Sequence, residues 1–133
     1  MTKTGPNTVA VNAISEEMFL ESWQDLAVRI NENARAKGFW QTDGSEGMVR
    51  ERSFGECIAL LHSELSEALE AWRHHNPESE KLPGFTQIEE ELADVAIRLM
   101  DTALHFAPRT AEAVIAKHEF NVTRSFRHGG KAL

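Results

Sequence analysis

The sequence predicts an all-α fold, a bundle of four to five helices. Apolar residues recur at intervals of three and four in four separate segments, as they do on the buried face of an amphipathic helix. Two of these segments begin with a capping box, which is typical of a helix N-terminus. No stretch alternates apolar and polar residues over the length of a strand. The length of 133 residues suits one domain with one packed core.

The first expected helix begins near Ser15, a suitable N-cap, and ends before Gly38. Its apolar positions are Phe19, Trp23, Leu26, Ile30 and Ala34. Residues 1–14 have no helical period and are expected to form a flexible arm, so the folded domain is expected over residues 15–133. The polar, glycine-bearing segment 41–52 is expected to be a loop.

Two further helices are expected after the capping boxes at 53–56 and 86–89. The first of them has an inward stripe that consists of Ile58, Leu61, Leu65, Ala68, Leu69 and Trp72. The second has a stripe that consists of Ile88, Leu92, Val95, Ala96, Leu99 and Ala103. Ile97 and Leu104 widen the apolar surface of this helix, so we expect a homo-oligomer to complete its burial.

The last helix is expected to have Pro108 in its first turn and to end at Gly129 and Gly130. Its apolar positions are Ala111, Ile115, Val122 and Phe126. Short to moderate connections between four amphipathic helices favour a bundle.

Charge and composition exclude several classes of partner. A formal net charge of -7 and a pI of about 5.3 argue against binding of a nucleic acid polymer or an anionic membrane surface. No apolar stretch approaches the roughly 20 residues of a membrane helix, and no secretory signal is evident. The single Cys57 suits a small buried hydrophobe in a reduced compartment, so we expect a cytoplasmic protein.

Two acidic pairs are the most informative polar feature. Glu64 and Glu67 lie three residues apart beside the apolar stripe of one expected helix, and Glu91 and Asp94 lie at the same spacing on the next. If these helices are antiparallel, four carboxylates face one another and repel unless a cation is present. Oxygen ligands without a cysteine or histidine set indicate Mg²⁺, with Mn²⁺ as a substitute. Because Mg²⁺ also takes phosphate oxygens, such a site recruits a polyphosphate.

A single acidic pair of this kind is usually part of a solvated face, and Arg98 is spaced to form an ion pair with Asp94. Two pairs beside buried stripes favour metal binding instead. A di-iron carboxylate bundle is disfavoured, because no glutamate is followed three residues later by a histidine.

The last expected helix offers a basic face for phosphate and sugar. Lys117, Asn121, Arg124 and His128 are spaced four, three and four, and Lys131 follows two glycines that allow it to close over a ligand. Cations near a helix C-terminus also complement its dipole, an interpretation that suits Lys131 equally well.

Trp40 is a candidate for stacking on a nucleobase, because it lies near an expected loop. The alternative is that Trp40 and Phe39 anchor this loop to the core.

These motifs resemble a known family. "ELSE" at 64–67, "ELAD" at 91–94 and "KHEFNVTRSFRHGGK" at 117–131 are similar to the signature of the MazG-like all-α nucleotide pyrophosphohydrolases, and the resemblance runs from about residue 37 to the C-terminus. It implies a dimeric or tetrameric all-α enzyme that hydrolyses nucleoside triphosphates, often deoxy ones, to a monophosphate and pyrophosphate. It also implies that Glu64, Glu67, Glu91 and Asp94 ligate Mg²⁺, while Lys117, Asn121 and Arg124 contact the substrate.

One position departs from the family pattern. Many members have an additional glutamate directly before the first ligand, and this chain has Ser63. If that glutamate activates water in the family, this protein uses another group, such as Glu90 or one of the four ligands, or a water activated by the metal alone. The departure also leaves open a non-catalytic alternative, a nucleotide-binding or helical interaction module.

Overall fold

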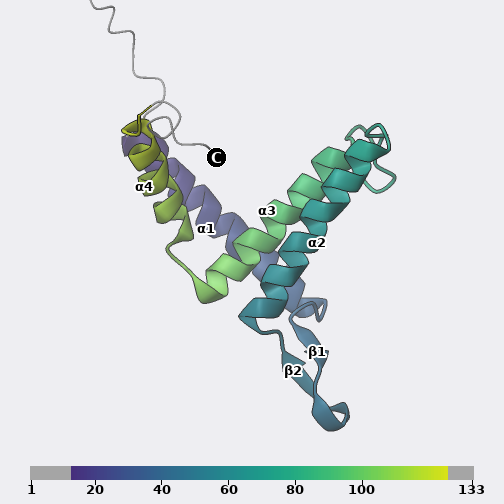
Figure 1. Ribbon diagram of the computed structural model, residues 1–133. Coiled ribbons are helices and arrows are strands. Elements are labelled where there is room, and N and C mark those ends of the chain that lie inside the picture. The colour runs from purple at the N-terminus through teal and green to yellow at the C-terminus, as the bar shows by residue number, and fades with distance from the viewer. Residues whose placement is uncertain (1–12, 126–133) are drawn as a thin grey trace, which may run out of the picture.

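The computed structural model describes residues 13–125, which form four helices and one small hairpin (Figure 1). The helices are α1 (Ala13–Ala36), α2 (Phe54–Arg73), α3 (Gln87–Phe106) and α4 (Thr110–Val122). They form two pairs: α2 lies against α3, α4 lies against α1, and α1 also packs across α3. The mainly helical fold predicted from the sequence is therefore confirmed. Within residues 13–125, no helix combines the length and apolar character needed to cross a bilayer.

A β-hairpin occupies most of the segment that was expected to be a loop. Strand β1 (Gln41–Asp43) pairs antiparallel with β2 (Val49–Glu51), with Thr42 opposite Arg50. A short 3₁₀ turn over Ser45–Gly47 joins them, and positive φ angles at Glu46 (59°) and Gly47 (73°) help to reverse the chain. The expectation of a loop without strands is wrong, because strands of three residues are too short to show a recognisable alternation.

The helix starts follow their caps. Ser53 and Thr86 each accept a hydrogen bond from the third backbone N–H, and Glu56 and Glu89 bond back to the cap residue, so both predicted capping boxes are confirmed. In contrast, α4 begins at Thr110 and not at Pro108, which lies in the preceding turn. It ends at Val122, earlier than expected.

Among the residues that the structure describes, the buried core of a single chain is small. It centres on Trp40, Ala34 and Cys57, and the other buried apolar side chains are Ala27, Ala71, Met100, Ala103, Ala111 and Ile115.

Much of the apolar stripe predicted for α2 and α3 is exposed. On α2, Leu65, Leu69 and Trp72 are 48%, 51% and 68% exposed, and on α3 Leu92 and Leu99 are 49% and 39% exposed. The expectation that Trp72 packs inside the bundle is wrong for one chain, because α2 and α3 bury the sides that face each other, α3 also packs on α1, and no other helix within residues 13–125 buries this stripe.

Candidate functional site

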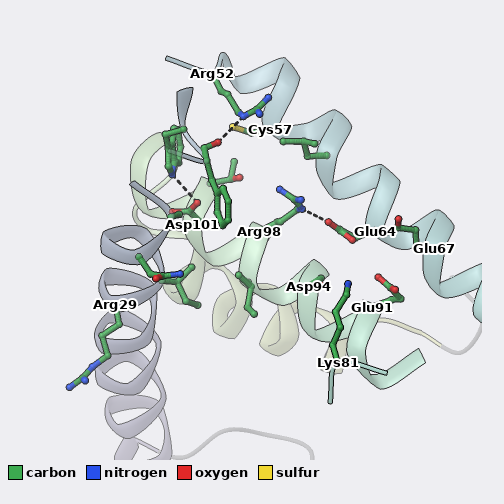
Figure 2. Close-up of a pocket in the computed structure, with 18 residues that line it drawn as sticks. Arg29, Arg52, Cys57, Glu64, Glu67, Lys81, Glu91, Asp94, Arg98 and Asp101 are labelled. Atoms are coloured by element: carbon green, nitrogen blue, oxygen red, sulfur yellow. Dashed lines mark hydrogen bonds and ion pairs between the residues drawn. The ribbon is translucent and has the colours of Figure 1, made fainter. Parts of the chain in front are cut away.

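A cavity of about 550 Å³ opens between α1, α2 and α3, next to the segment that leads into the hairpin. Side chains from all three helices line it (Figure 2). One end is acidic, and Cys57 and Arg52 lie at the other end. Trp40 belongs to the same buried group as Cys57, and the carbonyl of Phe39 accepts a hydrogen bond from Arg52, so both aromatic residues line that end. A volume of this size suits a small-molecule ligand.

Three glutamates meet at the acidic end. We define the acidic cluster as Glu64, Glu67 and Glu91, each of which places one carboxylate oxygen within 4.8 Å of the others. Asp94 lines the same cavity one turn further along α3. The packing of α2 against α3 thus brings all four predicted ligands to one cavity, although Asp94 lies outside the closest group.

The two glutamates that α2 contributes to the acidic cluster have opposite pKa shifts. Burial works to raise the pKa of Glu64, but hydrogen bonds from Arg98 and Glu67 outweigh it and lower that pKa. The hydrogen bond with Glu64 is the main cause that raises the pKa of Glu67 to about 7, with burial and the charges of Glu64 and Glu91 adding to it. The pair therefore shares a proton readily near neutral pH.

The two acidic residues that α3 contributes to the cavity near the cluster, Glu91 and Asp94, are also poor acids. Burial is the largest cause that raises the pKa of Glu91, followed by repulsion from Glu90 and Asp94. Burial also raises the pKa of Asp94, and repulsion from Glu64 adds to it. Both shifts therefore reflect burial of the carboxylates first, and then negative charge brought together without sufficient compensation. A donor set made only of carboxylate oxygens is the kind that Mg²⁺ and other hard cations bind, so the residues fit such an ion.

Arg98 and Lys81 are the cations nearest the acidic end. The Nε of Arg98 donates to Oε1 of Glu64. Arg98 therefore bonds across the α2–α3 interface. Its partner is not Asp94 on its own helix, although the sequence spacing allowed that ion pair. Lys81, in the connection between α2 and α3, lies with its Nζ 3.0 Å from Oε1 of Glu90.

Trp40 serves the fold at the other end of the cavity. It is only 4% exposed, and its indole N–H donates to Asp101 at 2.8 Å. Asn31 of α1 donates to the other oxygen of Asp101, also at 2.8 Å. Of the two interpretations of Trp40, this geometry favours the loop anchor over the stacking platform.

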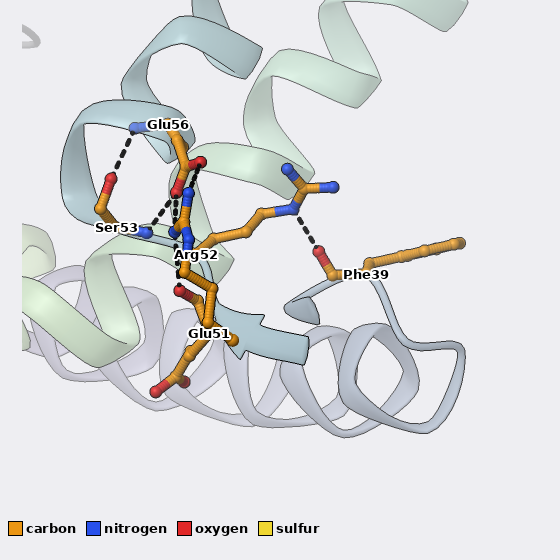
Figure 3. A network of polar contacts seen from close by, with 6 residues as sticks. Phe39, Glu51, Arg52, Ser53 and Glu56 are labelled. Atoms are coloured by element: carbon orange, nitrogen blue, oxygen red, sulfur yellow. Dashed lines mark hydrogen bonds and ion pairs between the residues drawn. The ribbon is translucent and has the colours of Figure 1, made fainter. Parts of the chain in front are cut away.

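Phe39 has the exposed ring that Trp40 lacks. Its side chain is 61% exposed at the cavity, and its carbonyl oxygen accepts a hydrogen bond from Nε of Arg52 at 2.8 Å (Figure 3). Arg50 holds Glu56 with two hydrogen bonds of 2.8 and 2.6 Å, which ties the hairpin to the start of α2. These hydrogen bonds hold the backbone of Phe39 and the adjoining hairpin in place.

Sequence reasoning missed Asp101, the exposed ring of Phe39 and the link between Arg98 and Glu64. The spacing of Asp94, Arg98 and Asp101, four and then three residues, does place them on one face of α3. It does not reveal which helix that face meets.

The part of the predicted basic face that the structure describes does not reach this cavity within one chain. Lys117, Asn121 and Arg124 are exposed, and none of them lines the cavity. Lys117 and Arg124 lie over the ring of Phe120, 4.8 and 6.0 Å from its centroid, and Arg124 follows the end of α4. In Figure 1, α4 lies on the arm opposite the α2–α3 pair. His128 and Lys131 lie outside the described residues.

Ser63, at the position where many family members have the additional glutamate, and Glu90, one of the groups that could act in its place, both lie outside the cavity lining. Ser63 is exposed, and its hydroxyl donates to the carbonyl of Leu60 at 2.7 Å. Glu90 is buried and accepts hydrogen bonds from Ser79 and Lys81, which lower its pKa. Glu90 therefore stabilises the α2–α3 connection.

Comparisons with protein-family models, curated proteins and solved structures found no match to this chain.

Proposed function

We propose that this protein is a Mg²⁺-dependent pyrophosphohydrolase that cleaves (deoxy)nucleoside triphosphates between the α and β phosphates, giving a nucleoside monophosphate and pyrophosphate. The observation that carries this proposal is the acidic cluster, whose oxygens converge within 4.8 Å at one end of a cavity large enough for a nucleotide. The resemblance of the paired acidic motifs to MazG-like enzymes supports the same reaction.

Glu64, Glu67, Glu91 and Asp94 would hold the metal ion, since all four line the acidic end. A bound Mg²⁺ supplies positive charge for the phosphates and lowers the pKa of a water molecule. The chain itself contributes a fixed arrangement of carboxylates between two capped helices, together with Arg98 and Lys81 at the cavity wall. Positive charge on these side chains would offset the charge of the leaving pyrophosphate.

The opposite end of the cavity supports a nucleoside in the same site. The exposed ring of Phe39 offers an aromatic face to a base, and the amide of Asn33 on α1 offers both a donor and an acceptor. An elongated ligand with a charged end and an aromatic end matches this division.

Pyrophosphate release from a panel of canonical and modified nucleoside triphosphates, with Mg²⁺ and with EDTA, tests the proposal. We expect metal-dependent release together with a monophosphate product. Glu67→Gln should lower kcat at least about 100-fold, because it removes a charge from the metal site without changing size. Glu70→Gln is the matched control, since Glu70 lies on the same helix, contacts Arg73 and His74, and does not line the cavity. Equal activity in the two variants would refute the proposed role of the cluster.

A nucleotide-binding module without turnover is the second candidate, and Ser63 is the observation that favours it. The hydroxyl of Ser63 bonds to its own helix, so this position offers no carboxylate to activate water. Tight binding of a triphosphate with no release of pyrophosphate from any member of the panel would support the module.

The exposed stripe on α2 and α3 supports assembly as a homodimer or homotetramer. We define the outer face as Leu65, Leu69, Trp72, Leu92 and Leu99, all between 39% and 68% exposed. Single exposed apolar residues are ordinary, but five large ones on two helices that pack together indicate an interaction surface. A second copy of the same face is the partner that a helical bundle requires.

A further inference from the structure

Arg98 is the cavity-lining cation that contacts the acidic cluster directly. Its Nε donates to Glu64, whose side chain is 9% exposed, whereas the side chain of Arg98 is 38% exposed. The other cations that line the cavity have different partners: Arg29 contacts Asp25, Arg52 contacts the carbonyl of Phe39, and Lys81 contacts Glu90. Arg98 therefore compensates the most deeply buried carboxylate of the cluster.

The contact uses only part of the guanidinium. Arginine has five N–H donors, and the bond to Glu64 uses the single one on Nε. Among residues 13–125, Glu64 is the one acceptor that Arg98 hydrogen-bonds, so both terminal nitrogens remain for a second acceptor. Figure 2 shows the guanidinium between Glu64 and the aromatic end of the cavity, where a bound nucleotide would pass.

We propose that Arg98 exchanges partners. It neutralises Glu64 in the metal-free protein, and it releases Glu64 to bind a phosphate oxygen of the substrate when a divalent cation occupies the acidic cluster. This inference rests on the proposed function, because it assigns a role in that same site.

Two physical effects drive the exchange. A divalent cation beside Glu64 takes over the compensation of its charge and repels the guanidinium at the same time. A triphosphate then presents oxygens in the geometry that a guanidinium fork binds best, and α4 brings no cation to the cavity within one chain. The partial exposure of Arg98 leaves its side chain room to move.

The alternative is that Arg98 permanently orients Glu64 toward the metal. The two roles predict opposite signs for metal affinity. A residue that orients a ligand strengthens metal binding, and its loss typically weakens that binding 10- to 100-fold. A residue that competes with the metal weakens binding, so its removal strengthens it.

The experiment measures two affinities in the full-length protein: Mn²⁺ alone, by titration calorimetry, and a nucleoside triphosphate with a non-hydrolysable α,β-methylene bridge, in the presence of Mg²⁺. For Arg98→Gln we expect Mn²⁺ to bind about tenfold more tightly and the analogue about tenfold more weakly. Arg29→Gln is the matched control, because it removes a charge from the same cavity but not from the acidic cluster, and should change each Kd less than about twofold.

Arg98→Lys is the second variant, and it replaces Arg98→Gln in the experiment if circular dichroism shows that Arg98→Gln does not fold. It keeps the charge and loses the fork, so Mn²⁺ affinity should stay near that of the wild type while the analogue binds about tenfold more weakly. Weaker Mn²⁺ binding in either variant would overturn the exchange in favour of orientation, and unchanged analogue binding would overturn the phosphate contact.

Pyrophosphate release by the wild type separates the two proposals. If the wild type releases pyrophosphate but Arg98→Gln leaves the affinity for Mn²⁺ unchanged, the exchange is overturned and hydrolysis stands. Failure to release pyrophosphate, with both affinities shifted as expected, would overturn hydrolysis and leave the exchange standing. A wild type that binds neither Mn²⁺ nor the analogue would overturn both.

Discussion

Replacing Trp40 by phenylalanine removes one hydrogen bond and part of one ring while keeping an aromatic side chain in the core. The indole N–H donates at 2.8 Å to Asp101, and the ring is 4% exposed. A hydrogen bond to a charged group contributes about 1.5–3 kcal/mol. The smaller ring leaves a void of roughly 40 Å³, which costs about 1 kcal/mol more at ~24 cal/mol per Å³.

The expected loss in the free energy of unfolding is therefore about 3 kcal/mol, since Asn31 still compensates Asp101. For a domain of this size that loss corresponds to a decrease in Tm of about 10 °C. Urea unfolding and calorimetry at one fixed protein concentration measure it, because assembly would make Tm depend on concentration.

Phe39→Ala is the matched comparison. Phe39 is 61% exposed, so its truncation should cost less than about 1 kcal/mol of stability. It should, however, change the ratio of kcat/KM between purine and pyrimidine triphosphates, whereas Trp40→Phe should leave that ratio unchanged. The reasoning is refuted if Trp40→Phe is as stable as the wild type and alters base preference, because Trp40 would then be the stacking residue.

Three further predictions concern pH, helix caps and assembly. Glu67 has a pKa of about 7 in the folded protein and about 4.5 in the unfolded chain, so the metal-free native state binds more protons between these two pH values. Its free energy of unfolding should therefore fall from pH 4.5 to 7 more steeply than that of Glu67→Gln, and parallel pH profiles from urea unfolding would contradict this. Ser53→Ala and Thr86→Ala should each cost about 1 kcal/mol in urea unfolding, and a loss near zero would mean that the capping boxes contribute little. Leu69→Glu, between Leu65 and Trp72 on the outer face, should dissociate the proposed oligomer in sedimentation velocity, and an unchanged mass would exclude this face as the interface.

The sequence by itself determined the local structure and the chemical character of the candidate site. Helix starts at Ser53 and Thr86 follow from capping boxes, whose donors and acceptors lie within three residues of one another. The acidic pairs follow equally directly, because residues three apart on a helix always share a face. Convergence of these pairs needed only one further condition, the antiparallel packing of α2 and α3 on either side of the connection at 74–86.

Only the tertiary structure decided which faces meet. The helical period places Leu69 and Trp72 on one apolar face, but it does not show that a single chain leaves this face exposed. The period identifies a face of the helix and not what packs against it. The bond from Arg98 to Glu64, and the one from Trp40 to Asp101, join residues that are 34 and 61 positions apart. The position of α4 away from the cavity was likewise decided by the tertiary structure. Such contacts depend on how rigid helices pack and on the paths of the connections between them, and spacing along one helix contains neither quantity.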